Sequence, residues 1–302
     1  MTREELDEKL NGRRLVVSVS GGKDSTAVCL FLKDLGFQPD EYERVFFDTG
    51  WEHSLAYEYL QTDLPPVVGP ITWLRAEVPL SADLEPVARR FEKRLGVEYS
   101  AMVRLCLKNS MFPARTLRFC TTHLKVFPAR DYLCQRENAV VNVVGIRAQE
   151  SAARALMLEW EYSGVFKCDT WRPLLTWSET QVIQLHQKHG VRPCRLYLEQ
   201  GSTRVGCSPC IYARKAEIRA LSDFSPERVQ LIADLEEELA QRAKTDPTWF
   251  HQKNAGPVPI AQVVKWSKTT RGGSVDQLEL FTDPLGHQGC VRWGMCETPT
   301  ND

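Results

Sequence analysis

The sequence has no long hydrophobic run, no internal repeat and no low-complexity tract. None of its apolar stretches approaches the roughly 18 residues that a membrane-spanning helix needs, which argues against a membrane partner. The first ten residues, MTREELDEKL, combine charge with a helical pattern, so we expect no signal peptide there. We therefore expect a cytoplasmic protein that has no membrane partner.

An excess of charge of either sign is also missing. The formal net charge is −1, because 38 Lys and Arg residues balance 39 Asp and Glu residues. A balanced chain has no overall attraction to polyanions, so nucleic-acid binding would require a local basic patch.

Cysteine, by contrast, is abundant, with ten in 302 residues. In a chain that we expect to be cytoplasmic, this number favours metal binding or catalysis over a disulfide framework. The length and the 43% hydrophobic content are sufficient for a full α/β core and a small second unit.

Strand-like and helix-like segments alternate through the first half, which predicts an α/β fold with a doubly wound parallel sheet. We expect strands over 14–20, 43–48, 71–78 and 139–145, and helices over 24–36, 82–94, 101–134, 178–190 and 225–239. From about residue 245 the pattern is irregular. We expect a nucleotide-binding unit over 1–222, followed by a helix and an irregular segment over 223–302.

The segment VSVSGGKDS (17–25) joins the first expected strand to the first long helix. A strand, a glycine turn and a helix N-terminus direct several backbone N–H groups at one point, which suits a phosphate. The Walker pattern does not fit, because Val17 stands where its first glycine belongs and Asp24 follows the lysine. An ordinary tight turn is the alternative, but SGGKDS as a block favours phosphate binding.

Two further motifs follow strands, at the sheet edge where ligands bind in open α/β folds. The first is Asp48-Thr49-Gly50, whose acid could meet a ribose or could cap a helix. The second begins at Gly145, where Arg147 leaves a strand and could grip phosphate oxygens, or could be a surface arginine.

In this order the three motifs resemble the pyrophosphate-binding loop (PP-loop) proteins of the adenine nucleotide α-hydrolase superfamily. They are most similar to its phosphoadenosine phosphosulfate (PAPS) reductase branch, over about residues 13–222. The resemblance implies that ATP or another adenine nucleotide binds to Ser18, Ser20, Gly21, Gly22, Lys23, Asp24, Ser25, Asp48, Thr49, Gly50, Gly145 and Arg147. Among these, Lys23, Asp24 and Arg147 are the implied catalytic residues.

A second set of motifs consists of cysteines. Cys207 and Cys210 form a C-x-x-C turn, which commonly binds zinc or an iron–sulfur cluster, although it can also be incidental. Assimilatory adenylylsulfate reductases resemble this chain in placing a cysteine pair upstream of such a turn, around a 4Fe–4S cluster. Here Cys120 stands in that position with Thr121 as its neighbour, so Cys194 is expected to complete the ligand set.

The same region also resembles phage and mobile-element members of the family and, more distantly, the DNA-phosphorothioation ATP pyrophosphatases. Cys29, Cys106, Cys134 and Cys168 lie in apolar or helical settings and are expected to be core residues. The sulfonucleotide reductase tail E-C-G-x-H is absent. Cys290 and Cys296 therefore stay open between a nucleophile, metal ligands and buried thiols.

Cations accompany the cysteines. Arg118, His123 and Lys125 flank Cys120 and could hold an anionic sulfur donor or a substrate phosphate. A second group surrounds the C-x-x-C turn and could form a local basic patch or a solvated helix face: Arg204, Arg214, Lys215 and Arg219.

The resemblance implies an enzyme, a transferase or an oxidoreductase, that cleaves the α–β phosphate bond of ATP. It would release pyrophosphate and adenylate an acceptor for sulfur transfer, with Mg²⁺ at the phosphates and a 4Fe–4S cluster beside them. A sulfur donor (a cysteine desulfurase or a thioredoxin-like reductant) and a nucleic-acid acceptor are candidate partners. One alternative is phosphoadenylylsulfate or adenylylsulfate reduction, and another is a non-catalytic nucleotide or redox sensor.

Overall fold

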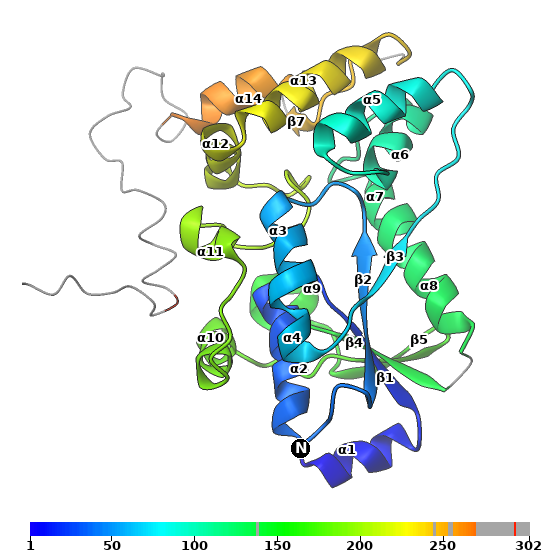
Figure 1. Cartoon of the computed structure of the whole chain (residues 1–302), viewed down its shortest axis with the longest axis vertical. Coiled ribbons are helices and arrows are strands. Elements are labelled where there is room, and N and C mark those ends of the chain that lie inside the picture. The colour runs from blue at the N-terminus through cyan, green and yellow to red at the C-terminus, as the bar shows by residue number, and fades with distance from the viewer. Residues whose placement is uncertain (137–138, 244–245, 253–255, 270–292, 294–302) are drawn as a thin grey trace, which may run out of the picture.

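A six-stranded sheet forms the centre of the protein, in a computed structural model that describes residues 1–136, 139–243, 246–252, 256–269 and 293 (Figure 1). The strand order is β3-β2-β1-β4-β6-β5. All neighbours pair in parallel except β5 and β6. The strands are β1 (Arg14–Ser18), β2 (Tyr42–Asp48), β3 (Thr72–Arg75), β4 (Val140–Val144), β5 (Trp160–Ser163) and β6 (Cys168–Trp171). The predicted α/β fold with a largely parallel sheet is confirmed.

Helices connect the strands and cover the sheet (Figure 1). They are α1 (Arg3–Leu10), α2 (Lys23–Asp34), α3 (Ser54–Glu58), α4 (Pro65–Val68), α5 (Glu85–Leu95), α6 (Ala101–Asn109), α7 (Phe119–Thr121), α8 (Phe127–Cys134), α9 (Ala152–Ala155), α10 (Glu179–Lys188), α11 (Arg195–Glu199), α12 (Lys215–Phe224), α13 (Pro226–Ala240) and α14 (Ile260–Ser267). Two π-helical turns, Tyr59–Asp63 and Thr122–Val126, continue α3 and α7, and a 3₁₀ turn spans Ala148–Glu150. A small hairpin pairs β7 (Phe250–Gln252) with β8 (Gly256–Val258).

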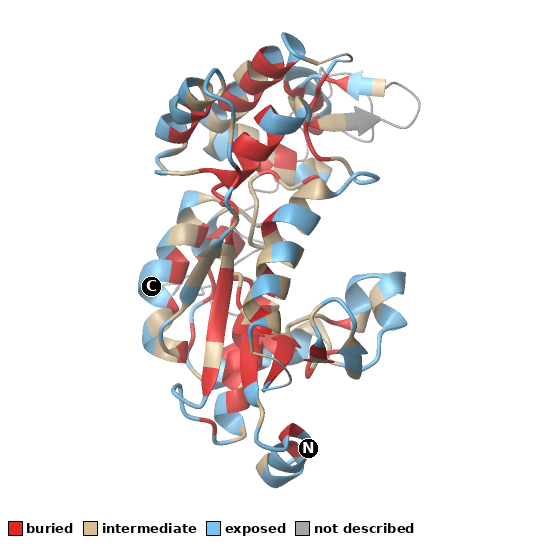
Figure 2. Ribbon diagram, turned by 90° about the vertical axis from the view of Figure 1, so that its right-hand side faces the viewer, coloured by how far each residue is buried: buried red, intermediate tan, exposed pale blue. Residues whose placement is uncertain are grey.

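The central strands form because their residues are apolar on both faces. In β1 and β4, Val17 lies beside Val143, and both are fully buried. Such a run suits a parallel strand that is covered on both sides. Buried residues accordingly run through the strands in Figure 2.

A second apolar cluster lies beyond the carboxyl ends of the strands, among α5, α6 and the C-terminal helices (Figures 1 and 2). Trp51, which follows β2, stacks on Trp249 with ring centres 5.0 Å apart. Leu235 of α13 and Phe91 of α5 belong to the same cluster. The cluster ties the segment after residue 222 to the strand ends, and the division at residue 222 stays a prediction.

Three local differences from the predicted elements have physical reasons. The segment 101–134 is helical only in parts, because Ser110 ends α6 with a left-handed backbone (φ 50°) and Pro113 follows. Strands β5 and β6 were not predicted, since each has four residues and no clear alternation. The segment after residue 245, expected to be irregular, contains β7, β8 and α14.

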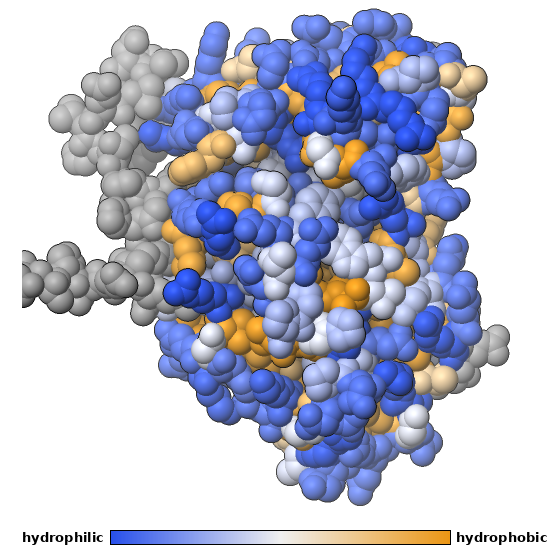
Figure 3. Space-filling view, viewed as in Figure 1, coloured by the Kyte–Doolittle hydropathy of each residue, from blue (hydrophilic) through white to orange (hydrophobic). Residues whose placement is uncertain are grey.

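The outer surface is largely polar. In Figure 3, hydrophilic residues cover most of the visible face, and apolar residues show only in scattered patches. Among the described residues, no helix combines the length and the apolar character needed to cross a membrane.

Candidate functional site

The SGGKDS loop turns from the end of β1 into the first turn of α2. Gly21 takes a left-handed backbone (φ +71°), which a side chain would strain. Ser25 stabilises the turn, because its hydroxyl accepts from the Ser20 N–H (3.1 Å) and donates to the Gly22 carbonyl (3.0 Å). Ser18 lies at the end of β1, in register with Val45 and Val144. The helix N-terminus therefore stands at the carboxyl edge of the sheet, in the arrangement that binds anions.

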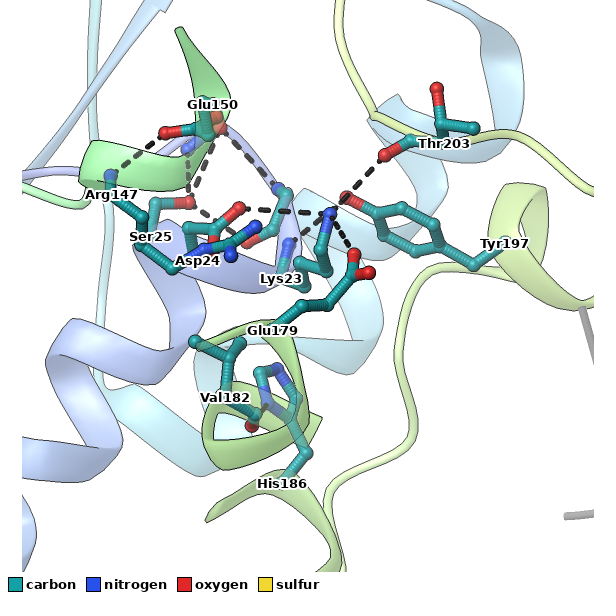
Figure 4. A network of polar contacts seen from close by, with 12 residues as sticks. Lys23, Asp24, Ser25, Arg147, Glu150, Glu179, Val182, His186, Tyr197 and Thr203 are labelled. Atoms are coloured by element: carbon teal, nitrogen blue, oxygen red, sulfur yellow. Dashed lines mark hydrogen bonds and ion pairs between the residues drawn. The ribbon is translucent and has the colours of Figure 1, made fainter. Parts of the chain in front are cut away.

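Lys23 is the buried cation of this loop, only 6% exposed. Its ammonium donates to the Thr203 carbonyl (3.2 Å) and forms ion pairs with Glu179 (3.2 Å) and Asp24 (3.7 Å), as Figure 4 shows. Its backbone N–H donates to the Tyr197 hydroxyl (3.1 Å). Segments near residues 179 and 200 therefore close over the loop. Glu179, Tyr197 and Thr203 were not found from the sequence, because they are remote in the chain and carry no motif.

Arg147 completes the charged row beside the loop (Figure 4). It is 5% exposed, and its Nε donates to Asp24 Oδ1 at 2.5 Å. A Cβ atom on Gly145 would lie 2.6 Å from the Asp24 carbonyl oxygen, so only glycine lets the end of β4 approach α2 this closely. The structure thus brings Lys23, Asp24 and Arg147 together.

Asp48 ends β2 and is almost fully buried. One carboxylate oxygen accepts two bonds from Arg75 (2.9 and 2.6 Å), and the other accepts from the Tyr57 hydroxyl (2.7 Å) and the Gly50 N–H (2.8 Å). Gly50 has φ +67°, and a Cβ there would lie 2.4 Å from Ser100 Cα. Asp48 and Gly50 therefore fix the end of β2, and a contact with a nucleoside stays a prediction.

Glu52 is a buried acid that the sequence analysis did not single out. The residue is 2% exposed. Its carboxylate accepts hydrogen bonds from the Thr49 hydroxyl (2.8 Å) and the Tyr57 hydroxyl (3.0 Å). Burial, Glu52 and Asp48 together raise the pKa of Tyr57, so this phenol stays a hydrogen-bond donor. The Cys207 thiol lies 3.9 Å from Glu52 Oε1, which links this network to the C-x-x-C turn.

Three of the four predicted ligand cysteines lie around one small cavity of about 80 Å³: Cys120, Cys207 and Cys210. Burial raises the pKa of the Cys207 thiol to about 12, although the nearby Lys125 opposes the shift. The pKa of Lys125 is itself raised, chiefly by Cys207. An ammonium therefore lies close to the thiols, where it favours their deprotonated form.

The fourth predicted ligand, Cys194, does not join this cavity. It lies in the core cluster that contains Val17 and Leu30, and its thiol donates to the Leu55 carbonyl at 3.5 Å. Within the described residues, no group of three or more His, Cys, Asp or Glu side chains is arranged to hold a metal ion. The described thiols therefore do not fit a four-cysteine cluster that includes Cys194. Cys290 and Cys296 lie outside the described residues.

One cavity of about 340 Å³ joins the loop to the thiols. Ser20 lines it from the loop, and Cys207 and Cys210 line it from the C-x-x-C turn. Lys125 adds a positive charge, whereas Arg204 is paired with Glu217 of the same lining. This cavity has the features of a site for an anionic substrate beside sulfur-bearing residues.

A larger cavity of about 690 Å³ lies beside it, lined by Asp48, Tyr57, Arg75 and others. Glu52 and His53 line both cavities. Burial and the charge of Arg228 lower the pKa of His53 to about 4, so this imidazole is neutral near pH 7.

A parallel sheet with an S-G-G-K-D-S loop between its first strand and the following helix, and an arginine beside that loop, defines a PP-loop nucleotide-binding protein. Residues 89–213 match the family described as the phosphoadenosine phosphosulfate reductase domain. The chain is also 32% identical over 326 residues to the "Uncharacterized 37.8 kDa protein in gpa 5'region" of Escherichia phage 186, across 93% of this chain and 96% of that protein. The chain therefore belongs to the same family as this phage protein, and its residues 89–213 are similar to the PAPS reductase domain.

Two solved structures are similar to this chain. One is the phosphate complex of phosphoadenylyl-sulfate reductase from Candida auris, at 16% identity and a TM-score of 0.48, across 70% of this chain and 90% of that one. The other is FMN adenylyltransferase from Candida glabrata in complex with ATP, at 18% identity and a TM-score of 0.39, across 66% and 53%.

Proposed function

We propose that this protein binds ATP at the SGGKDS loop, cleaves the α–β phosphate bond and releases pyrophosphate. The acceptor adenylated in this way would then receive sulfur. The observation that carries the proposal is the 340 Å³ cavity, because Ser20 of the phosphate loop and the Cys207–Cys210 pair line the same space. A nucleotide held at one end would place its reacting phosphate toward the thiols at the other.

The residues beside the loop have separate roles in this proposal. The first turn of α2 offers backbone N–H groups to the phosphates, and Lys23 and Arg147 offset the charge that develops on them. In the structure these two cations pair with Asp24 and Glu179, so phosphate oxygens would replace carboxylates as their partners. The same carboxylates are suitable ligands for Mg²⁺, which would neutralise phosphate charge when bound.

Cys120, Cys207 and Cys210 are the proposed ligands of an iron–sulfur cluster because they line one cavity, although these described thiols are not arranged to hold a metal ion. Such a cluster would supply electrons or carry sulfur. Cys194 is not proposed as a ligand, because it lies in a different core cluster.

A second candidate is reduction of a sulfonucleotide, and the family match favours it. In that reaction a cysteine thiolate attacks the sulfonyl sulfur and the nucleotide phosphate leaves. The thiols of Cys207 and Cys210 lie at the cavity, and a second thiol could then release sulfite as a disulfide forms.

Both candidates are tested by product analysis after anaerobic purification. The protein is incubated with ATP, phosphoadenylylsulfate or adenylylsulfate, with Mg²⁺ and a desalted cell extract as the source of acceptor and sulfur donor. We expect AMP and pyrophosphate in equal amounts from ATP, and neither product from the Lys23→Ala variant. Thiol-dependent release of sulfite would support the second candidate instead, and ATP binding without turnover would indicate a sensor.

A further inference from the structure

The two segments that carry the three clustered cysteines contain no carboxylate. Residues 99–130 include no Asp or Glu, and neither do residues 200–216, although acids slightly outnumber bases in the whole chain. Their cations are Arg104, Lys108, Arg115, Arg118, Lys125, Arg130, Arg204, Arg214 and Lys215. Although the net charge of the whole chain is close to zero, positive charge is therefore concentrated in the two segments that carry these cysteines.

Several of these cations have no carboxylate partner. Arg104 pairs with Glu92, and Arg204 pairs with Glu217, so their charges are compensated. In the described part of the chain, four other exposed cations form no side-chain ion pair: Lys108, Arg115, Arg118 and Arg214. We call these four side chains the basic face. Unpaired cations on a surface are available to a polyanion.

Part of the basic face lies next to the small thiol cavity. Arg115 Nε donates to the Ile211 carbonyl at 3.2 Å, and its guanidinium lies 5.7 Å from the Tyr212 ring centre. Both Ile211 and Tyr212 line the thiol cavity. Arg118 precedes the cavity residue Cys120 by two positions, and Arg214 follows Tyr212 by two. Arg115 therefore lies at the border of the cavity, and Arg118 and Arg214 lie within two residues of it along the chain.

A groove of about 560 Å³ extends the basic face along α8. Lys108 and His123 line it together with Phe127 and an Arg130–Asp131 ion pair, and Glu77 adds one further carboxylate. One exposed ring lies beside an arginine in each place: Phe127 is 4.8 Å from the Arg130 guanidinium in this groove, and Tyr212 lies beside Arg115 at the thiol cavity. Phosphates bind to cations, and unpaired bases stack on exposed rings.

We propose that the basic face binds an unpaired nucleic-acid strand and presents it to the thiol cavity as the acceptor. This inference rests on the proposed function, whose acceptor it assigns to a chemical class. The exposed rings distinguish a nucleic acid from an acidic peptide, since bases have aromatic faces that stack and carboxylate side chains do not.

The test is fluorescence anisotropy with labelled DNA and RNA strands of about 20 nucleotides and mixed sequence, across a salt series. The triple variant Lys108→Ala, Arg118→Ala, Arg214→Ala removes three proposed phosphate contacts. We expect at least tenfold weaker binding near 50 mM salt, and a slope of log affinity against log salt that is smaller by about 2. The matched control changes three exposed cations elsewhere, Lys9, Lys33 and Lys93, to Ala, and we expect it to bind like the unchanged protein.

Tyr212→Ala tests the aromatic part separately, since it should weaken binding without changing the salt slope. Equal binding by the triple variant and its control would overturn the inference, as would no binding by the unchanged protein near 50 mM salt. Displacement of the strand by poly-glutamate at equal charge concentration would overturn it in favour of an acidic protein. Calorimetry with ATP on the same samples separates this failure from a failure of the proposed function, because the triple variant leaves the SGGKDS loop intact.

Discussion

Replacing Lys23 with alanine is the sharpest perturbation of the phosphate loop. Lys23 is buried against the Tyr197 ring, with its ammonium 5.3 Å from the ring centre, and it is the cation nearest to the start of α2. Its contacts with Thr203 and Glu179 hold the ammonium at the carboxyl edge of the sheet. In the proposed complex the ammonium donates to a phosphate oxygen, and alanine removes that bond.

The magnitude follows from the partners that Lys23 exchanges. A hydrogen bond to a charged group contributes about 1.5–3 kcal/mol, which corresponds to about 10- to 150-fold in affinity. Part of that gain is lost, because the ammonium must first leave the Glu179 carboxylate at 3.2 Å. We therefore expect the lower half of the range, with ATP binding about 10- to 40-fold weaker.

Calorimetric titration with Mg–ATP measures the effect directly. Lys33→Ala removes an exposed cation from the same helix and should bind ATP like the unchanged protein. Lys23→Met keeps the aliphatic stem over Tyr197, so it separates lost charge from lost packing and should bind as weakly as Lys23→Ala. An unchanged dissociation constant in both Lys23 variants would refute phosphate binding by this lysine.

Three further predictions concern the other parts of the site. Arg147→Ala should lower the rate of pyrophosphate release at least tenfold, and Arg147→Lys should retain part of that rate, because lysine keeps the charge but not the planar guanidinium that binds two phosphate oxygens. Equal rates for the two variants would contradict this role. Cys207→Ser should abolish the absorption and the roughly four irons expected for a cluster, whereas Cys194→Ser should keep both, because Cys194 lies in a different core cluster. In the unfolded chain the His53 imidazole binds a proton at its ordinary pKa of about 6.5, whereas in the folded chain it does so only near pH 4. The free energy of unfolding of the unchanged protein therefore falls as the pH drops from about 6.5 to 4, and His53→Asn should flatten this dependence. Urea unfolding at several pH values measures this slope, and equal slopes in the two proteins would contradict the assignment.

The sequence was sufficient for the parts of the fold and site that depend on local patterns. The apolar runs of β1 and β4 predicted buried parallel strands, and the helix expected over 178–190 is α10, which opens with a capping box at Ser178. Gly145 and Arg147 were recognised as a motif, and the structure adds the reason for the glycine, which is the close approach to Asp24.

The remaining features depend on contacts between distant segments. Glu179, Tyr197 and Thr203 contact the loop from more than 150 residues along the chain, and no pattern in their local sequence predicts these contacts. Cys194 was expected to complete the ligand set because Thr121 stands where a second upstream cysteine was expected. Its backbone instead turns it into the core against Leu55, which only the packing of α3 and α11 decides.

The central claim is that the phosphate loop and the thiols belong to one pocket. The direct measurement is the rate at which iodoacetamide alkylates Cys207 and Cys210 in the metal-free protein, followed by mass spectrometry with and without saturating ATP. We expect that ATP slows the alkylation of both thiols, that it leaves the rate at Cys134 unchanged, and that Lys23→Ala abolishes the protection. Unchanged alkylation of Cys207 and Cys210 at an ATP concentration that calorimetry shows to be saturating would contradict it.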